Sequence, residues 1–242
     1  MTYCVGMLLD EGLVMVLDSR TNAGVDHIGT FRKMTIWETP GERVVILLTA
    51  GNLAIAQAVV NLLNEGLDNG ESEETILTVP SMFGAARLVG NAVREVYRLE
   101  GEAMKEQGVE FSPSFILGGQ IRDRHMRLFQ IYAVGNFIEA TDDTPFFQVG
   151  EFKYGKPILD RALNTATGLV DGVKLALVSM DSTMRSNISV GLPIDVAVYE
   201  KDSCRVKLTR RIEENDPYFI EISQGWSAAL QESFQRLPDP DW

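Results

Sequence analysis

The sequence predicts an α+β domain in which two stacked sheets lie between outer layers of helices, a four-layer αββα sandwich. Three observations favour this class. The strand candidates are apolar nearly throughout, as strands covered on both faces require. Helical stretches follow them in separate runs, so the order is strands, two helices, strands, two helices, strands. No internal repeat, low-complexity tract or linker divides the 242 residues.

The chain opens with two β-rich runs around a short acidic turn. The runs at residues 3–9 and 13–17 flank Asp10-Glu11-Gly12, which is typical of a β-hairpin. Further apolar runs predict strands at residues 33–37, 43–48, 114–120, 128–134 and 194–200.

Three long segments have the spacing of amphipathic helices. Residues 52–64 carry one apolar stripe, and residues 81–107 carry another directly after Pro80. The third helical segment begins near Pro157 and ends near Met184, with a break at residues 164–168. Residues 68–74 predict a polar acidic loop.

The segment 216–242 is longer than this core needs. We therefore interpret residues 1–215 as the αββα domain and residues 216–242 as a C-terminal helical extension. Its apolar side chains recur at helical spacing, and they either pack on their own subunit or dock on a neighbouring one; they are Trp226, Leu230, Phe234 and Leu237.

Charge and hydropathy exclude several function classes. The net charge of −12 argues against nucleic acid and against an anionic membrane surface as partners. No apolar run reaches the roughly 18 residues of a membrane span. The N-terminus lacks the basic and apolar regions of a secretory signal, so we expect a cytoplasmic protein.

Few residues of the usual catalytic and metal-binding types are present. His27 and His125 are the only histidines, so neither a metal site nor a Ser-His pair is expected, and no cofactor is predicted. Cys4 and Cys204 predict two free buried thiols. Cys4 is interpreted as a small strand residue and not as a nucleophile.

Several short motifs occur in one order along the chain. Thr2 follows Met1 directly, the hairpin leads to Asp18-Ser19-Arg20-Thr21, and Lys33 comes next. The later motifs are Leu48-Thr49-Ala50-Gly51-Asn52, Gly135-Asn136-Phe137-Ile138-Glu139, Gly150 with Arg161-Ala162-Leu163, and Ile194-Asp195-Val196-Ala197-Val198. From Thr2 to about Lys201 this series resembles the proteasome β-subunit family of N-terminal-nucleophile hydrolases, and within it the bacterial Anbu (ancestral β-subunit) branch.

The resemblance implies a threonine-type peptidase or amidohydrolase with the αββα fold. Thr2 would be the nucleophile after removal of Met1, because the freed α-amine, with a reference pKa near 8, can act as its base. A nearby Lys33 would disfavour a second positive charge and lower the pKa of that amine. Asp18 would hold Lys33 charged and in place.

Supporting positions follow from the same alignment. Leu48 falls where the family has a glycine whose N–H stabilises the oxyanion, and Gly51 lies three residues on. Glu151 falls where the family has a serine near the N-terminal amine. Asn187 and Ser189 would provide neutral versions of further contacts. Arg20, from the Asp18-Ser19-Arg20 motif, is the remaining candidate.

The implied partners are further copies of the chain, in a ring-like or open homo-oligomer, and a peptide or amide substrate. The sequence does not identify an unfoldase partner. Two alternatives remain open: an amidase acting on a small molecule, and an assembly whose catalytic centre is weak. A threonine at position two is commonplace, and Lys33 alone would be interpreted as a solvated charge at a strand end.

Overall fold

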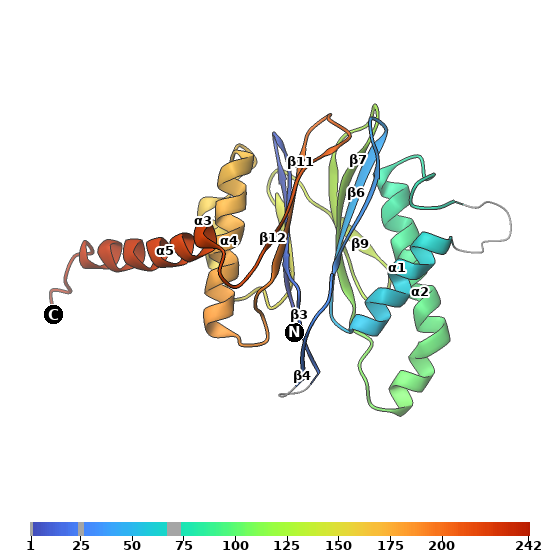
Figure 1. Ribbon diagram of the computed structural model, residues 1–242, viewed down its shortest axis with the longest axis horizontal. Coiled ribbons are helices and arrows are strands. Elements are labelled where there is room, and N and C mark those ends of the chain that lie inside the picture. The colour runs from blue at the N-terminus through green and yellow to red at the C-terminus, as the bar shows by residue number, and fades with distance from the viewer. Residues whose placement is uncertain (1, 24–26, 67–73) are drawn as a thin grey trace.

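Two antiparallel five-stranded sheets form the centre of the structure, and helices lie on their outer sides (Figure 1). The structure is a computed structural model and describes residues 2–23, 27–66 and 74–242. One sheet has the order β10-β1-β2-β11-β12, the other has the order β5-β6-β7-β8-β9, and β3 and β4 form a separate hairpin. The predicted α+β class is confirmed.

The first sheet is built around the predicted N-terminal hairpin. Its strands are β1 (Tyr3–Leu9), β2 (Gly12–Asp18), β10 (Phe146–Gly150), β11 (Ile194–Glu200) and β12 (Val206–Ile212). β1 and β2 pair from Cys4 opposite Leu17 to Leu9 opposite Gly12. β11 pairs with β2 on its other side, so that Ile194 lies opposite Asp18.

The second sheet contains the apolar runs from the middle of the chain. Its strands are β5 (Met34–Thr39), β6 (Arg43–Ala50), β7 (Ser114–Ile121), β8 (Arg127–Ile131) and β9 (Phe137–Glu139). The hairpin outside both sheets consists of β3 (Arg20–Ala23) and β4 (His27–Thr30), and it connects the end of β2 to the start of the second sheet.

Each sheet has its own pair of helices. α1 (Leu53–Glu65) and α2 (Met82–Glu106) lie outside the second sheet, whereas α3 (Lys156–Ala162) and α4 (Leu169–Ser186) lie outside the first (Figure 1). The predicted break in the third helical segment is confirmed, because residues 163–168 separate α3 from α4. The predicted loop at 68–74 lies almost wholly outside the described residues.

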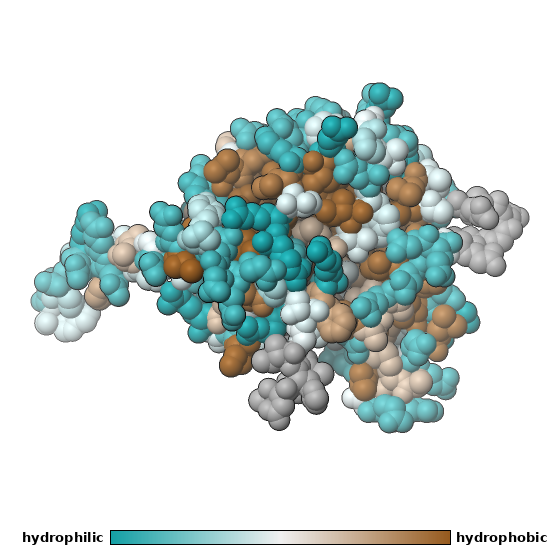
Figure 2. All heavy atoms as spheres, viewed as in Figure 1, coloured by the Kyte–Doolittle hydropathy of each residue, from teal (hydrophilic) through white to brown (hydrophobic). Residues whose placement is uncertain are grey.

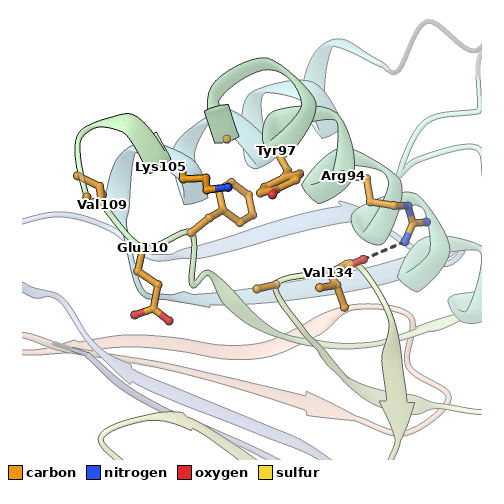
Figure 3. A pocket seen from close by; sticks show the side chains of 10 residues that line it. Arg94, Tyr97, Lys105, Val109, Glu110 and Val134 are labelled. Atoms are coloured by element: carbon orange, nitrogen blue, oxygen red, sulfur yellow. Dashed lines mark hydrogen bonds between the residues drawn. The ribbon is translucent and has the colours of Figure 1, made fainter. Parts of the chain in front are cut away.

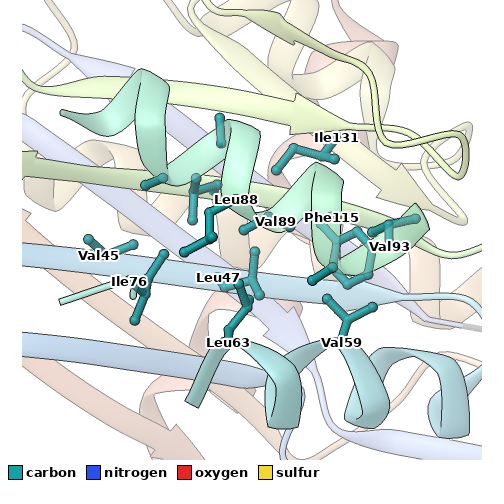
Figure 4. Packing of buried hydrophobic residues seen from close by; sticks show 14 of the residues in the cluster. Val45, Leu47, Val59, Leu63, Ile76, Leu88, Val89, Val93, Phe115 and Ile131 are labelled. Atoms are coloured by element: carbon teal, nitrogen blue, oxygen red, sulfur yellow. The ribbon is translucent and has the colours of Figure 1, made fainter. Parts of the chain in front are cut away.

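Buried apolar side chains form three clusters between these layers. One cluster packs α1 and α2 on the second sheet, with Val59, Val89 and Phe115 at its centre (Figure 4). A second packs α3 and α4 on the first sheet. The third lies between the two sheets and includes Leu17 and Leu48. Burial on both faces explains why the central strands lack polar alternation.

The sequence did not predict five short or polar strands: β3, β4, β9, β10 and β12. The strand β12, with the sequence VKLTRRI, is the clearest example, because it lies at a sheet edge and most of its side chains are exposed. An edge strand buries little apolar surface, so its sequence carries little apolar signal. The strand predicted at 128–134 ends at Ile131, since residues 132–135 form a turn.

The C-terminal helix α5 (Pro217–Gln235) projects away from the rest of the molecule (Figure 1). Asp216 caps it by accepting a hydrogen bond from the Phe219 N–H at 3.0 Å, and Phe219 is buried against α4 and the first sheet. None of the helices within the described ranges is both long enough and apolar enough to cross a membrane.

Candidate active site

Thr2 lies directly before β1 and is 6% exposed. Its carbonyl oxygen accepts a hydrogen bond from the Glu151 N–H at 2.9 Å, just beyond the end of β10. Gly150 has a φ of +82°, and a Cβ atom there would lie 1.8 Å from that carbonyl oxygen. Only glycine fits this close approach, so β10 fixes the main chain of Thr2.

Lys33 connects the hairpin to β5, and its ammonium group reaches the Thr2 hydroxyl. Nζ donates to Thr2 Oγ1 at 2.6 Å and also donates to the carbonyl oxygen of Arg20. The backbone of Lys33 is fixed in turn, since its carbonyl oxygen accepts from the Thr49 N–H at 3.0 Å. Lys33 is 5% exposed, so water screens these contacts little.

Asp18 is the last residue of β2 and completes a buried charged pair with Lys33. The distance from its Oδ2 to Lys33 Nζ is 3.8 Å. Its Oδ1 accepts a hydrogen bond from the Tyr3 N–H at 2.8 Å, and the backbone N–H of Gly191 donates to the same carboxylate. The carboxylate thus lies between the first residues of β1 and the lysine.

Burial moves the pKa values of both members of this pair toward neutrality. Desolvation raises the pKa of Asp18 to about 6, although Lys33 and the N–H groups of Tyr3 and Gly191 oppose the shift. Desolvation lowers the pKa of Lys33, and the charge of Asp18 opposes that change. A buried lysine and carboxylate with shifted pKa values, beside a hydroxyl oxygen, are typical of a functional site.

A second polar network supports the strand end that carries Asp18. Ser19 Oγ donates to Asp195 Oδ2 at 2.5 Å, and Arg211 Nη1 contacts both oxygens of Asp195 at 2.9 and 3.0 Å. The Ser19 N–H also donates to the Pro193 carbonyl oxygen at 2.7 Å. Asp195 and Arg211 come from the neighbouring strands β11 and β12, opposite each other in register.

The turn after α4 contacts the Arg20 side chain and Asp18. Arg20 Nη1 donates to the Ile188 carbonyl oxygen at 3.2 Å, and a Cβ atom on Gly191 would overlap the Arg20 guanidinium. Asn187 Oδ1 accepts from the Ser189 N–H at 2.9 Å, so Asn187 shapes this turn. Gly191, in the same turn, reaches Asp18 through its N–H.

The alignment of Leu48 with the glycine that stabilises the oxyanion requires a correction. It lies inside the paired strand β6, opposite Met34 on one side and Ile116 on the other, and its side chain is fully buried between the sheets. Leu48 therefore does not border a substrate pocket. Of the two candidates for the oxyanion-stabilising N–H, Gly51 is the better placed, because it follows the end of β6, is exposed and has a φ of +96°.

A cavity of about 350 Å³ opens beside Lys33. Most of its lining is polar, and Arg32 and Thr49 border it next to Lys33; the other residues are Thr35, Leu53, Ala56, Gln57, Val60 and Asn61. A larger cavity, of about 660 Å³, lies at the C-terminal end of α2, where Tyr97 and Val134 face each other (Figure 3). Thr2, Asp18 and Lys33 are not among the residues that line this larger cavity.

Both cysteines are free and buried, and burial raises the pKa of the Cys4 thiol, which keeps it protonated. Within residues 2–23, 27–66 and 74–242, no group of three or more His, Cys, Asp or Glu side chains is arranged to hold a metal ion.

The structure brings Thr2, Asp18 and Lys33 together, as well as the main chain of Arg20 and Glu151. The Glu151 carboxylate lies 3.7 Å from Lys153 Nζ. Sequence reasoning missed the roles of Asp195 and Arg211. A carboxylate inside the apolar run of β11 was the available signal, because a buried charge requires a partner.

Comparison with known proteins identifies close structural relatives at about half sequence identity. The chain is similar to a Gly-1 mutant of Anbu from Hyphomicrobium sp. strain MC1, with 50% identity, 100% of each chain covered and a TM-score of 0.93. It is similar to Anbu from Yersinia bercovieri, with 48% identity, 99% of each chain covered and a TM-score of 0.90. A helical assembly of the Anbu complex from Pseudomonas aeruginosa has 49% identity, 98% coverage of each chain and a TM-score of 0.90.

A more distant similarity extends to the proteasome. A proteasome β subunit of Methanocaldococcus jannaschii is 22% identical over 213 residues, which cover 88% of each chain. No protein-family model matches the chain.

Proposed function

The chain belongs to the Anbu (ancestral β-subunit) family of proteasome-like N-terminal-nucleophile hydrolases, and on that basis we propose that it is a threonine-type hydrolase of peptide or amide bonds. The observation that carries the proposal is the hydrogen bond from Lys33 Nζ to Thr2 Oγ1 at 2.6 Å in a buried site. With its αββα layers, the fold would be the one that N-terminal-nucleophile hydrolases share.

Removal of Met1 would complete the site by converting the Thr2 amide into a free amine. That amine and Lys33 would then lie on either side of one hydroxyl group. A positive charge on Lys33 disfavours protonation of the amine, which would keep the amine available as a base. Asp18, held by the N–H groups of Tyr3 and Gly191, balances the charge of Lys33.

The reaction follows from these positions. The amine takes the proton of Oγ1 as the oxygen attacks the substrate carbonyl carbon, and Lys33 keeps the oxygen in place. The C–N bond of the substrate breaks, the proton passes to the leaving amine, and an ester to Thr2 remains. Water then hydrolyses this ester and restores the hydroxyl. The Gly51 N–H would stabilise the oxyanion in both steps.

The cavity beside Lys33 would accept the substrate side chain next to the scissile bond. Arg32 and the polar side chains of Thr35, Gln57 and Asn61 line it. A polar or acidic substrate side chain therefore fits this cavity better than a large apolar one. The same site would also accept a small amide, so a non-peptidase amidase is the second candidate function.

We also propose that the chain works as a homo-oligomer, for which the helical assembly of the Pseudomonas aeruginosa relative is the main support. A cytoplasmic location agrees with two free cysteines. The test of the hydrolase is labelling by a threonine-directed electrophile, followed by mass analysis of the N-terminal peptide. The expected result is a covalent adduct on Thr2 in protein from which Met1 has been removed. Labelling elsewhere would contradict the assignment of Thr2 as the nucleophile.

A further inference from the structure

The cavity at the C-terminal end of α2, which we call the α2 cavity, has the size of a small-molecule site. Its volume of about 660 Å³ lies within the range of roughly 300–1,000 Å³ that ligand pockets usually occupy. One face of α2, the loop from Gly108 to Phe111 and the turn that holds Val134 form its walls. The α2 cavity therefore lies in the helical layer outside the second sheet, whereas Thr2 leads into the first sheet.

Close backbone contacts fix the walls of the α2 cavity. A Cβ atom on Gly90 would lie 2.2 Å from the Gly135 carbonyl oxygen, and a Cβ atom on Gly135 would lie 2.4 Å from the Gly90 carbonyl oxygen. The turn at residues 132–135 thus packs directly on the backbone of α2. Arg94 Nη1 ties the two walls together by donating to the Val134 carbonyl oxygen at 3.4 Å. The cavity is therefore built into the fold before any ligand binds.

Two aromatic rings give the α2 cavity an apolar surface. The ring centroids of Tyr97 and Phe111 lie 5.0 Å apart, with the ring planes at 75°. Gly101 leaves room for the Tyr97 ring, because a Cβ atom there would lie 2.8 Å from it. Val134, which is 70% exposed, faces Tyr97 across the cavity (Figure 3). Apolar side chains gathered in an exposed hollow mark a binding surface.

The space-filling view agrees with this arrangement. In Figure 2, brown and pale atoms lie together at the lower right of the molecule, where Figure 1 shows the C-terminal half of α2. Hydrophilic atoms surround them, so the apolar surface is bounded by polar groups, as the surface of a ligand site is.

Two cations border this apolar surface. Arg94 lies at one end of the α2 cavity and Lys105 at the other, on either side of Tyr97 (Figure 3). Glu110 is the carboxylate among the described residues that line the cavity, and it points away from Tyr97 and Lys105 in Figure 3. Two cations against one carboxylate give the cavity a positive balance, although the chain has a net charge of −12.

Arg94 is oriented but not neutralised. Its Nη2 donates to Asn91 Oδ1 at 2.6 Å, and its Nη1 donates to Val134. The ion pairs that α2 makes within the described part of the chain are Arg87 with Glu74 and Arg98 with Glu95, so neither includes Arg94. A guanidinium held in this way keeps further N–H groups that can bind a carboxylate.

These features favour one class of ligand, a flat apolar or aromatic molecule with a single acid group. Its carboxylate would accept hydrogen bonds from Arg94, and its apolar body would lie between Tyr97 and Val134. A cationic molecule would be repelled by Arg94 and Lys105. The end of a peptide would bring N–H and C=O groups into a largely apolar hollow and leave them without partners, which costs free energy.

We propose that the α2 cavity is a second ligand site, which binds a small aromatic carboxylate with its acid group on Arg94 and its ring between Tyr97 and Val134. The site is separate from Thr2, so binding requires neither hydrolysis nor removal of Met1. The proposal therefore does not depend on the proposed hydrolase function.

The first test is titration calorimetry of the full-length protein, as it assembles in solution, with indole-3-acetate. We expect saturable binding with a Kd below about 1 mM. Indole-3-acetamide has the same shape without the charge and should bind at least about 10-fold more weakly. Equal affinities for the two molecules, or no saturable binding of indole-3-acetate, would overturn the proposal. Tighter binding of an eight-residue peptide with a free C-terminal tryptophan would also overturn it, because the cavity would then be a site for a protein end.

The second test locates the binding with variants of α2. Arg94→Gln should weaken the binding of indole-3-acetate by about 10- to 100-fold. Arg98→Gln is the matched control, since Arg98 is exposed on the same helix and pairs with Glu95 outside the cavity. Equal losses in the two variants, or no loss in Arg94→Gln, would overturn the assignment of the acid group to Arg94.

A third variant tests the cavity without removing a charge. Gly101→Ala should keep the fold, because alanine favours a helix interior over glycine. Its Cβ atom would meet the Tyr97 ring and displace it, so the binding of indole-3-acetate should weaken at least about 10-fold. Unchanged affinity in a folded Gly101→Ala variant would overturn the placement of the ligand beside Tyr97, whatever the result for Arg94→Gln.

Discussion

Lys33 donates a hydrogen bond from Nζ to Oγ1 of Thr2 across 2.6 Å, although the two residues directly precede strands of different sheets. Thr2 leads into the first sheet and Lys33 leads into the second, so the contact forms only when the sheets pack together. The fold therefore assembles the candidate nucleophile and its lysine in the same step that buries the core between the sheets.

Removal of the lysine amine should abolish most of the activity. We expect Lys33→Ala to lower kcat by about 10²- to 10³-fold, the usual cost of losing one positioned donor, because the variant no longer holds Oγ1 or disfavours protonation of the Thr2 amine. Lys33→Arg should not restore it, because a planar guanidinium does not fit the position of a compact ammonium group. Arg32→Ala is the matched control: it should raise KM while changing kcat little, since Arg32 lines only the cavity. A larger kcat loss in Arg32→Ala than in Lys33→Ala would contradict this division of roles.

The pH dependence should report on Asp18. Because its folded-state pKa is about 6, the carboxylate ionises as the pH rises through this value, and the rate should rise with it. Asp18→Asn should remove this limb from the pH–rate profile and lower the plateau. Combined with Lys33→Ala, it should add little further loss, as groups in one unit are non-additive. A profile that is flat in the parent protein from pH 5 to 7 would contradict the role of Asp18.

The raised pKa of Asp18 also makes the stability of the fold depend on pH. Stability should fall as the pH rises, whereas the rate should increase. The folded-state value of about 6 exceeds the usual 3.8, so the folded state binds this proton more tightly than the unfolded chain. Asp18 therefore stabilises the fold most below about pH 4, and this contribution is lost as the pH rises through 6. Asp18→Asn should reduce the fall in unfolding free energy over that range, which denaturant melts at several pH values would measure.

The Ser19–Asp195–Arg211 network should affect the rate by holding the strand end that carries Asp18 in position. Asp195→Asn keeps the size of the side chain but weakens its contacts with Arg211, and we expect a loss of about 1.5–3 kcal/mol in stability. The rate should fall while the acid limb of the pH profile stays near 6, because Asp18 and Lys33 remain. Loss of stability with an unchanged rate would show that the network serves the fold alone. Arg210→Gln is the control, since Arg210 contacts Asp216 instead.

Gly150 should tolerate no side chain. Gly150→Ala places a Cβ atom 1.8 Å from the Thr2 carbonyl oxygen, so Thr2 must move. We expect the rate to fall more than stability does. Gly108→Ala is matched in backbone conformation, with a φ of +66° and open space around the missing Cβ. It should cost about 1–2 kcal/mol or less from the backbone alone and leave the rate unchanged. Equal rates in the two variants would contradict the fixed position of Thr2.

The sequence predicted the parts of the fold that bury apolar surface. The runs at β1, β2, β6, β7 and β11 are apolar because both faces of each strand are covered, so they stand out without an alternating pattern. β12 did not stand out because its edge position leaves most side chains exposed. The role of Arg211 was missed with it, and the partner of Asp195 could not be identified.

The site was predicted unevenly for a similar reason. Thr2, Asp18 and Lys33 were identified from motif order and resemblance, and the structure brings them together. Leu48 was aligned with the oxyanion glycine because alignment alone does not distinguish a buried residue inside a paired strand from Gly51, which follows the strand end three residues later. Contacts made by main-chain atoms, such as the Glu151 N–H on Thr2, leave no side-chain signal in a sequence.

The most direct test of the threonine nucleophile is intact and peptide mass analysis of protein treated with a threonine-directed electrophile. The prediction is an N-terminal peptide that begins at Thr2, lacks Met1 and carries one adduct. Thr2→Ser should still be labelled, because it keeps a hydroxyl, whereas Thr2→Ala should not. Retention of Met1 throughout an active preparation, or undiminished turnover by Thr2→Ala, would contradict the assignment of Thr2 as the nucleophile.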